Sequence, residues 1–137
     1  DYAEFDGRPH PHEGHEDFRY DAFRTAVNWS VDQAWWDKNP QAAGLSRRLL
    51  GFFASQGPDG KPYPHLYTLD GKPLSDEPAK GLMASNAVAA LLVDKPLATR
   101  FVNDLWALEP PAGQWRYYDG LLQFMALLHV TGRFKAW

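Results

Sequence analysis

The sequence Phe18-Arg19-Tyr20-Asp21-Ala22-Phe23-Arg24 places one carboxylate between two guanidinium groups and three aromatic rings, where a helix is expected to begin. Asp21 and Arg24 are three residues apart, a spacing that puts both side chains on one face of a helix. We expect the arginine to favour the ionised carboxylate and the rings to exclude water around the pair. A carboxylate held in this way suits a general base that acts on a sugar. The alternative is an ordinary structural ion pair near a helix start.

Outward from this stretch, apolar residues keep the period of an α-helix in about five segments. The expected helices cover about residues 21–36, 41–55, 81–93, 95–108 and 117–131. Pro40 and Gly132 are residues typical of helix ends. The pattern predicts an all-α chain of successive antiparallel helix pairs.

A long segment, residues 56–80, has little helical character. It contains two similar turn signals, Asp59-Gly60 and Asp70-Gly71, on either side of an apolar and aromatic run. Asp-Gly is a good turn pair, so this segment can form a short β-hairpin. Because long loops in compact domains usually serve a function, we predict that it forms the wall of a cleft.

The last expected helix is apolar nearly all round, from Leu121 to Val130. A helix of this kind must be covered on every side. Five helices alone would not cover it together with the many aromatic rings. The sequence therefore predicts a further partner surface.

Composition narrows the class of protein. The chain has 137 residues, enough for one domain, and its aromatic share of 15% is high. Tyr and Trp line clefts that bind sugar rings as well as filling cores. The net charge is −3 without a basic cluster, which argues against a nucleic-acid partner. No apolar run reaches the roughly 18 residues of a membrane span, and there is no cysteine.

Residues 10–17 contain three histidines and three carboxylates. Imidazole and carboxylate are suitable ligands for a divalent metal, but this spacing matches no closed tetrahedral pattern. No nucleotide fingerprint or phosphate loop is present either. We therefore predict neither a metal site nor a cofactor.

The stretch Phe18 to Arg24 resembles the Tyr-Asp-Ala-x-Arg motif of glycoside hydrolase family 8. Two downstream strings agree with it, Gly81-Leu82-Met83-Ala84-Ser85-Asn86-Ala87 and Arg116-Tyr117-Tyr118-Asp119-Gly120-Leu121-Leu122. The ending Leu127 to Phe134 is similar to the last helix of the xylan-active members. The resemblance covers the C-terminal part of the family's domain. It implies that residues 1–137 form the C-terminal part of an (α/α)6 barrel, as a fragment of a single catalytic domain.

The resemblance also implies site residues and a reaction. Members hydrolyse β-1,4-linked polysaccharides with inversion, and Asp21 occupies the position of the general base. Arg24 occupies the position of the arginine that orients the base. Four further residues are expected to bind the substrate: Tyr20, Arg19, Tyr117 and Tyr118. The family's acid glutamate has no match here, so we expect an N-terminal part of the same enzyme to supply it.

Substrate choice follows less directly from the resemblance. Xylan or xylo-oligosaccharide is the expected substrate, cleaved either by an endo-xylanase or by release of the reducing-end xylose. The second type uses a His-bearing loop before the Gly-Leu-x-Ala helix, whereas residues 74–80 contain no histidine. Endoglucanase, lichenase and chitosanase members share the base motif, and a non-catalytic carbohydrate-binding fragment is a further alternative. An endo-acting enzyme would be secreted or periplasmic, and an oligosaccharide-acting one cytoplasmic.

Overall fold

A computed structural model describes residues 2–3, 5–6, 9–10, 16–114 and 116–134. The helices within these residues are α1 (Tyr20–Trp36), α2 (Ala42–Gln56), α3 (Lys80–Ala89), α4 (Lys95–Ala107) and α5 (Arg116–Val130). Two short 3₁₀ helices, η1 (Pro58–Gly60) and η2 (Ala90–Leu92), follow α2 and α3. All five expected helices are therefore confirmed.

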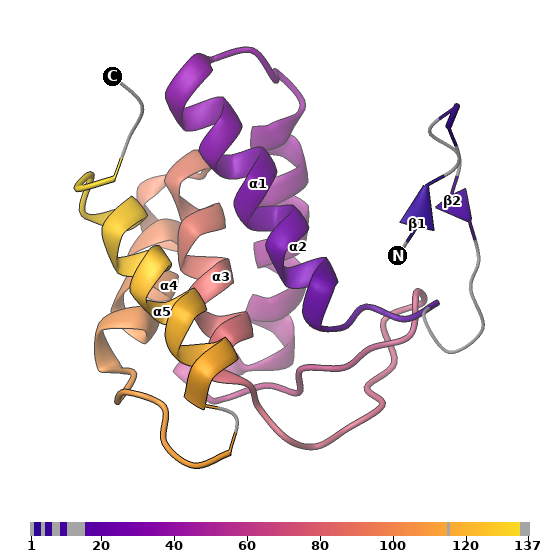
Figure 1. Cartoon of the computed structure of the whole chain (residues 1–137), viewed down its shortest axis with the longest axis vertical. Coiled ribbons are helices and arrows are strands. Elements are labelled where there is room, and N and C mark those ends of the chain that lie inside the picture. The colour runs from indigo at the N-terminus through magenta and orange to yellow at the C-terminus, as the bar shows by residue number, and fades with distance from the viewer. Residues whose placement is uncertain (1, 4, 7–8, 11–15, 115, 135–137) are drawn as a thin grey trace.

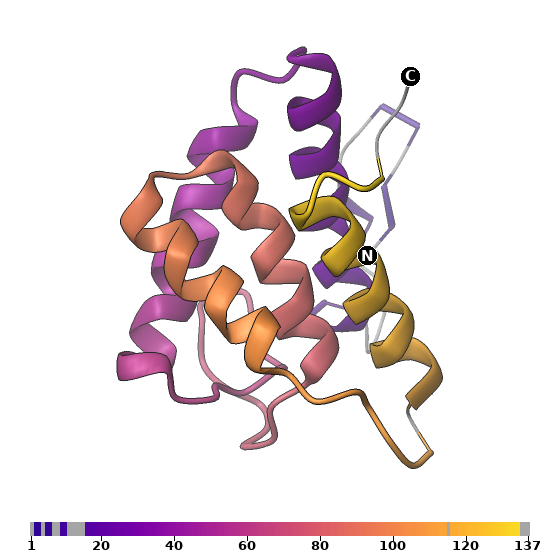
Figure 2. The ribbon, with the colours of Figure 1, turned by 90° about the vertical axis from the view of Figure 1, so that its left-hand side faces the viewer.

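Helix α3 lies at the centre of the helical body, with α1, α4 and α5 packed against it (Figures 1 and 2). Nearly all of its residues are buried, and many of them are small. Small side chains let three neighbouring helices approach one axis, so this sequence suits a central position. The Ser85 hydroxyl donates to the Gly81 carbonyl at 2.8 Å, which satisfies it inside the core.

Much of the aromatic excess lies in the core and not in a cleft. Phe23, Phe53, Tyr63, Tyr67 and Phe101 are all almost completely buried. The ring of Phe53 is 4.9 Å from that of Tyr63 and 5.8 Å from that of Tyr67, between centroids. This cluster joins α2 to the long loop, so the loop is anchored by buried rings.

Helix α1 begins without a side-chain cap, because the residue at its N-cap position, Arg19, has no side-chain acceptor. Asp21 lies in its first turn, where the helix dipole favours a negative charge. The helix ends when Asp37 adopts a left-handed conformation, and the Asp37 N–H donates to the Gln33 carbonyl at 3.0 Å. The end therefore comes from a C-terminal cap, a few residues before Pro40.

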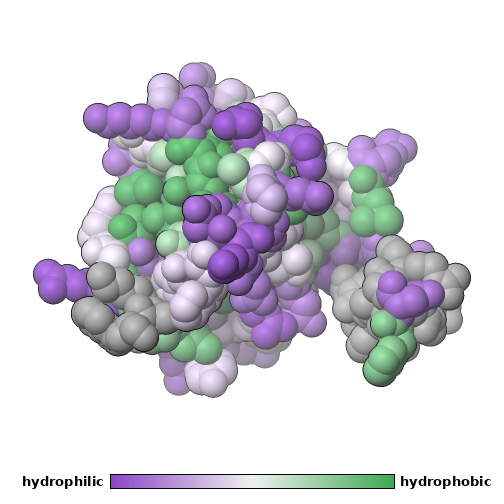
Figure 3. Space-filling view, turned by 90° about the horizontal axis from the view of Figure 1, so that it is seen from above, coloured by the Kyte–Doolittle hydropathy of each residue, from purple (hydrophilic) through white to green (hydrophobic). Residues whose placement is uncertain are grey.

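Helix α5 leaves an apolar face uncovered. Three of its residues, Tyr117, Leu121 and Phe124, are 81%, 49% and 58% exposed. The polar residues Gln123 and His129 are instead buried against the body. Uncovered apolar area is also visible at the end of the body in Figure 3, bordered by hydrophilic side chains. The described chain does not cover its own last helix, as the sequence predicted.

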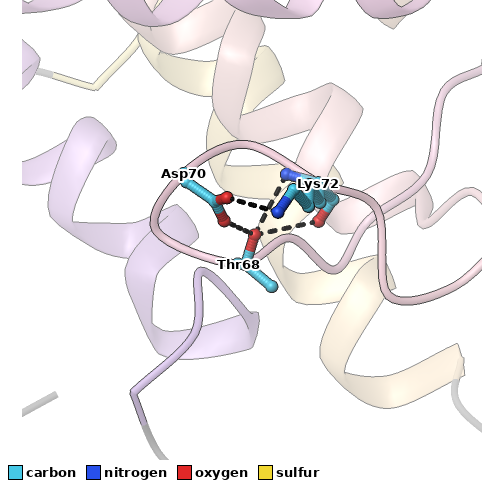
Figure 4. Close-up of polar contacts among 3 residues, drawn as sticks. All are labelled: Thr68, Asp70 and Lys72. Carbon is cyan, nitrogen blue, oxygen red and sulfur yellow. Dashed lines mark hydrogen bonds and ion pairs between the residues drawn. The ribbon is translucent and has the colours of Figure 1, made fainter.

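The long loop follows η1 and leads to α3. Tyr67 forms single antiparallel bridges with Phe18 and with Pro73, and no strand forms between residues 57 and 79. The turn between Thr68 and Lys72 is closed by polar contacts: the Lys72 N–H donates to the Thr68 hydroxyl oxygen at 3.0 Å (Figure 4). The Thr68 N–H also donates to the Lys72 carbonyl at 2.9 Å. Lys72 Nζ also pairs with Asp70 Oδ2 at 2.9 Å. Within the loop, the predicted hairpin is thus reduced to the bridge between Tyr67 and Pro73 and a tight turn.

A small antiparallel pair, β1 (Tyr2–Ala3) and β2 (Pro9–His10), stands apart from the helices (Figure 1). Most of the histidine-rich stretch, residues 11–15, lies outside the described residues. In the part of the chain that the structure describes, no helix has the length and apolar character needed to cross a bilayer.

Candidate active site

A cavity of about 450 Å³ opens where the start of α1, the end of the long loop and the start of α5 meet. Its lining comprises two tyrosines, a histidine, two acidic residues and two small apolar residues: Tyr20, His65, Glu77, Pro78, Ala79, Tyr118 and Asp119. Polar groups and aromatic faces meet in one hollow, which is the composition expected of a sugar-binding cleft.

Asp21 and Arg24 form the predicted ion pair beside this cavity. Arg24 Nη2 donates to Asp21 Oδ1, and both charges act on the nearby Tyr118 hydroxyl. The pair is exposed, however, with side-chain accessibilities of 53% for Arg24 and 66% for Asp21. The expectation that aromatic rings exclude water around it is wrong for this chain, since both side chains are more than half exposed.

The three sequence motifs converge through two long-range hydrogen bonds. The Tyr118 hydroxyl donates to the Tyr20 carbonyl at 2.7 Å, across 98 positions of sequence. The Gly81 N–H donates to Asp119 Oδ1 at 3.2 Å, across 38 positions. Helix α5 therefore fixes the starts of α1 and α3 at once, which places Asp21 next to the cavity.

Glycine is favoured at position 81, because a larger residue would displace the side chains that approach it. A Cβ there would lie 2.6 Å from Asp119 Oδ1 and 2.9 Å from Leu122 Cδ1. Asp119 also supplies the first-turn acceptor that the start of α3 lacks, because the preceding Ala79 provides no side-chain cap. The motif glycine and the motif aspartate thus form one structural unit.

Burial changes the proton affinity of two cavity residues. Burial raises the pKa of the Asp119 carboxyl, an effect that the Gly81 N–H and the nearby His65 and Lys80 side chains partly oppose. Burial also raises the pKa of the Tyr118 hydroxyl, and the positive charge of Arg24 lowers it by a smaller amount. Tyr118 therefore acts as a neutral hydrogen-bonding group at neutral pH.

Two other predicted substrate-binding residues do not line the cavity. Arg19 Nη2 instead pairs with Asp17 Oδ2. Tyr117 is 81% exposed on the uncovered face of α5. Of the four residues expected to bind substrate, only Tyr20 and Tyr118 come together, with ring centroids 6.3 Å apart in an edge-to-face arrangement.

His65 and Glu77 belong to the cavity although the sequence did not mark them as site residues. His65 is 7% exposed and sits beside Tyr20, with ring centroids 5.6 Å apart. Both residues come from the long loop, whose prediction as a cleft wall is consistent with this lining. No local motif identifies them, because their position depends on how the loop folds back.

A second cavity, of about 370 Å³, lies between α2 and the turn of the long loop. It is lined mainly by apolar side chains, with Asp70 as its one carboxylate. That carboxylate is committed to Thr68 and Lys72, whose hydrogen bonds lower the pKa of Asp70. The cavity next to Asp21 is therefore the better candidate for chemistry. No cluster of three or more metal-ligating side chains occurs among the described residues.

Comparison with known proteins supports the motif resemblance over the whole chain. No protein-family model matches it. A curated relative, the reducing-end xylose-releasing exo-oligoxylanase Rex8A of Paenibacillus barcinonensis, is 38% identical over 100% of this chain and 37% of its own length. A family 8 protein of Teredinibacter turnerae, solved as a xylobiose complex, is 48% identical with a TM-score of 0.90. A catalytic mutant xylanase from that organism, solved as a xylohexaose complex, is 49% identical with a TM-score of 0.89.

Along its whole length the chain matches proteins of glycoside hydrolase family 8. It corresponds to the C-terminal portion of members that form (α/α)6 barrels, and the relatives that match it include xylanases and exo-oligoxylanases. The match covers all of this chain but only 35% of each Teredinibacter structure. The chain thus spans about a third of the length of the relatives it matches.

Proposed function

We propose that residues 1–137 are the C-terminal part of a family 8 xylanase catalytic domain, with Asp21 as the general base. The observation that carries this proposal is the Asp21–Arg24 pair beside a cavity lined by Tyr20 and Tyr118. Similarity to proteins solved with xylobiose and xylohexaose supports xylan or its oligosaccharides as the substrate.

In the proposed reaction, Asp21 removes a proton from a water molecule that attacks the anomeric carbon. Arg24 donates a hydrogen bond to the carboxylate and holds it in one orientation. An inverting enzyme needs a carboxylic acid about 6.5–9.5 Å from the base, on the other side of the sugar, to protonate the leaving oxygen. We assign this role to a glutamate in the remaining part of the domain.

The exposure of Asp21 fits this division of the domain. A base that faces bulk water is poorly positioned, so a further wall must close over the pair. The uncovered face of α5, with Leu121 and Phe124, offers the apolar area against which further helices would pack. We propose that the N-terminal part of the same protein covers both.

The test is Asp21→Asn in the complete protein, assayed on xylan. We expect turnover to fall by about 100- to 10,000-fold, the usual contribution of a general base, with little change in substrate binding. The matched control is Asp32→Asn, because Asp32 is also an exposed aspartate on α1 but lies three turns further along. Near-wild-type turnover of Asp21→Asn would contradict the base assignment.

Endo action is favoured over release of the reducing-end xylose. The loop before α3 places Glu77 and Pro78 in the cavity, and residues 74–80 contain no histidine. Products from polymeric xylan and from xylotriose distinguish the two modes. Mixed oligosaccharides from xylan support endo action, whereas stepwise release of xylose from xylotriose would contradict it.

A further inference from the structure

His65 is held by its own loop at the inner side of the cavity. Its ring atom Nδ1 lies 2.5 Å from the Glu77 carbonyl oxygen, and its backbone N–H donates to the same oxygen at 3.1 Å. The residue is 7% exposed, so the ring has little freedom to reorient. Two contacts to one carbonyl fix both the backbone and the ring of His65.

These contacts determine which ring nitrogen carries the proton. A carbonyl oxygen can only accept a hydrogen bond, so Nδ1 must be the donor. In a neutral imidazole the other nitrogen, Nε2, is then an acceptor. Nε2 faces the Tyr20 hydroxyl oxygen at 3.4 Å. When the ring is neutral, the Tyr20 hydroxyl therefore donates a hydrogen bond to His65 Nε2.

The direction of this hydrogen bond decides what Tyr20 offers to a ligand. With its proton committed to His65, the Tyr20 oxygen presents its remaining lone pair to the cavity as an acceptor. The Tyr20 backbone carbonyl is held separately by Tyr118, so the residue is fixed at both ends. The 3.4 Å contact is long, as hydrogen bonds in unliganded sites often are, and it can tighten when a ligand excludes water.

We infer that His65 is a positioning residue that makes the Tyr20 hydroxyl an acceptor for a sugar hydroxyl bound next to Asp21. This inference rests on the proposed function, because it assumes a sugar in the cavity. The group recognised is a hydroxyl donor. A ligand with an ether or deoxy carbon at that position would leave the Tyr20 oxygen unpaired.

The first test reads the tautomer directly and requires no activity. Long-range ¹H–¹⁵N spectra of the neutral imidazoles in the complete protein should show His65 protonated at Nδ1 and bare at Nε2. His65→Gln assigns the resonance. In Tyr20→Phe, the Nε2 signal should move towards that of an unbonded nitrogen. A proton on Nε2, or a signal that does not respond to Tyr20→Phe, would overturn the inference.

The second test is a double-mutant cycle for xylan hydrolysis by the complete protein. His65→Leu should lower kcat/KM by about 3- to 10-fold, the loss expected for one neutral hydrogen bond. His65→Gln should restore most of it, since its amide oxygen can accept from Tyr20. In a Tyr20→Phe background, His65→Leu should have no further effect. An equal loss in both backgrounds would show a purely structural role and overturn the inference.

Failure of the inference and failure of the proposed function have different signatures. If Asp21→Asn retains turnover, the base assignment is wrong, and the spectra still decide whether Tyr20 donates to His65. If Asp21→Asn abolishes turnover while the cycle shows no coupling, the proposed function stands and the role of His65 falls. If His65→Leu does not fold, the spectra of the unsubstituted protein and of Tyr20→Phe give the decision.

Discussion

Replacing Gly81 with alanine tests the contact between α3 and α5 that positions the site. The added Cβ would lie 2.6 Å from Asp119 Oδ1 and 2.9 Å from Leu122 Cδ1, both closer than real carbon contacts. Asp119 must then rotate away and lose its bond to the Gly81 N–H, or α5 must move outwards. Moving α5 would also disturb the bond between Tyr118 and Tyr20.

The expected cost follows from opposing contributions. Overpacking in a core costs about 1–3 kcal/mol, and losing a hydrogen bond to a charged group costs a similar amount if Asp119 rotates instead. The higher helix propensity of alanine stabilises the folded state by at most about 1 kcal/mol. We therefore expect Gly81→Ala to lower the free energy of unfolding by about 1–2 kcal/mol.

Urea denaturation of the complete protein, followed by tryptophan fluorescence, measures this change. The matched control is Gly51→Ala, because Gly51 is an exposed glycine within α2 and its added Cβ would meet nothing within 4 Å. That variant should gain about 0.5–1 kcal/mol from helix propensity alone. If Gly81→Ala is as stable as Gly51→Ala, the contact with Asp119 and Leu122 does not select glycine at position 81.

Two further predictions concern pH. Because burial raises the pKa of Asp119, the folded state binds its proton more tightly, and the wild-type protein loses stability as pH rises through that range. Asp119→Asn should remove this slope above about pH 4, the ordinary range of an aspartate, while its amide oxygen still accepts the hydrogen bond from the Gly81 N–H, and an unchanged slope would contradict this prediction. Burial lowers the pKa of His129, which packs against the rings of Trp35 and Phe134. Stability should therefore fall as pH drops below about 6.5, the ordinary pKa of histidine, and His129→Phe should be less acid-sensitive than wild type in thermal melts.

The five helices could be predicted from sequence because helical periodicity is a local property. The sequence could also predict the ion pair of Asp21 and Arg24 next to Tyr20, since its two residues are three apart on one helix. Their exposure could not be predicted, because it depends on what covers α1 from outside. The position of Arg19 outside the cavity has a local reason, because its guanidinium group pairs with the neighbouring Asp17.

The parts that sequence reasoning missed all depend on contacts between distant segments. His65 is placed by the return of a loop to Glu77, and nothing within a few residues of it indicates a cavity. Asp119 could be read as a cleft group or as a residue of a first turn. In the structure it is both, because it lines the cavity and also serves as the acceptor for Gly81, 38 positions away.

The bond from Tyr118 to the Tyr20 carbonyl has a consequence for the order of events during synthesis. The bond closes a loop of 98 positions, so the chain must lose the conformational entropy of that loop when the contact forms. While α5 is still inside the ribosome, α1 has already been made, but Asp21 does not yet have its fixed surroundings. The surroundings of Asp21 should therefore become fixed only after α5 has left the exit tunnel and docked.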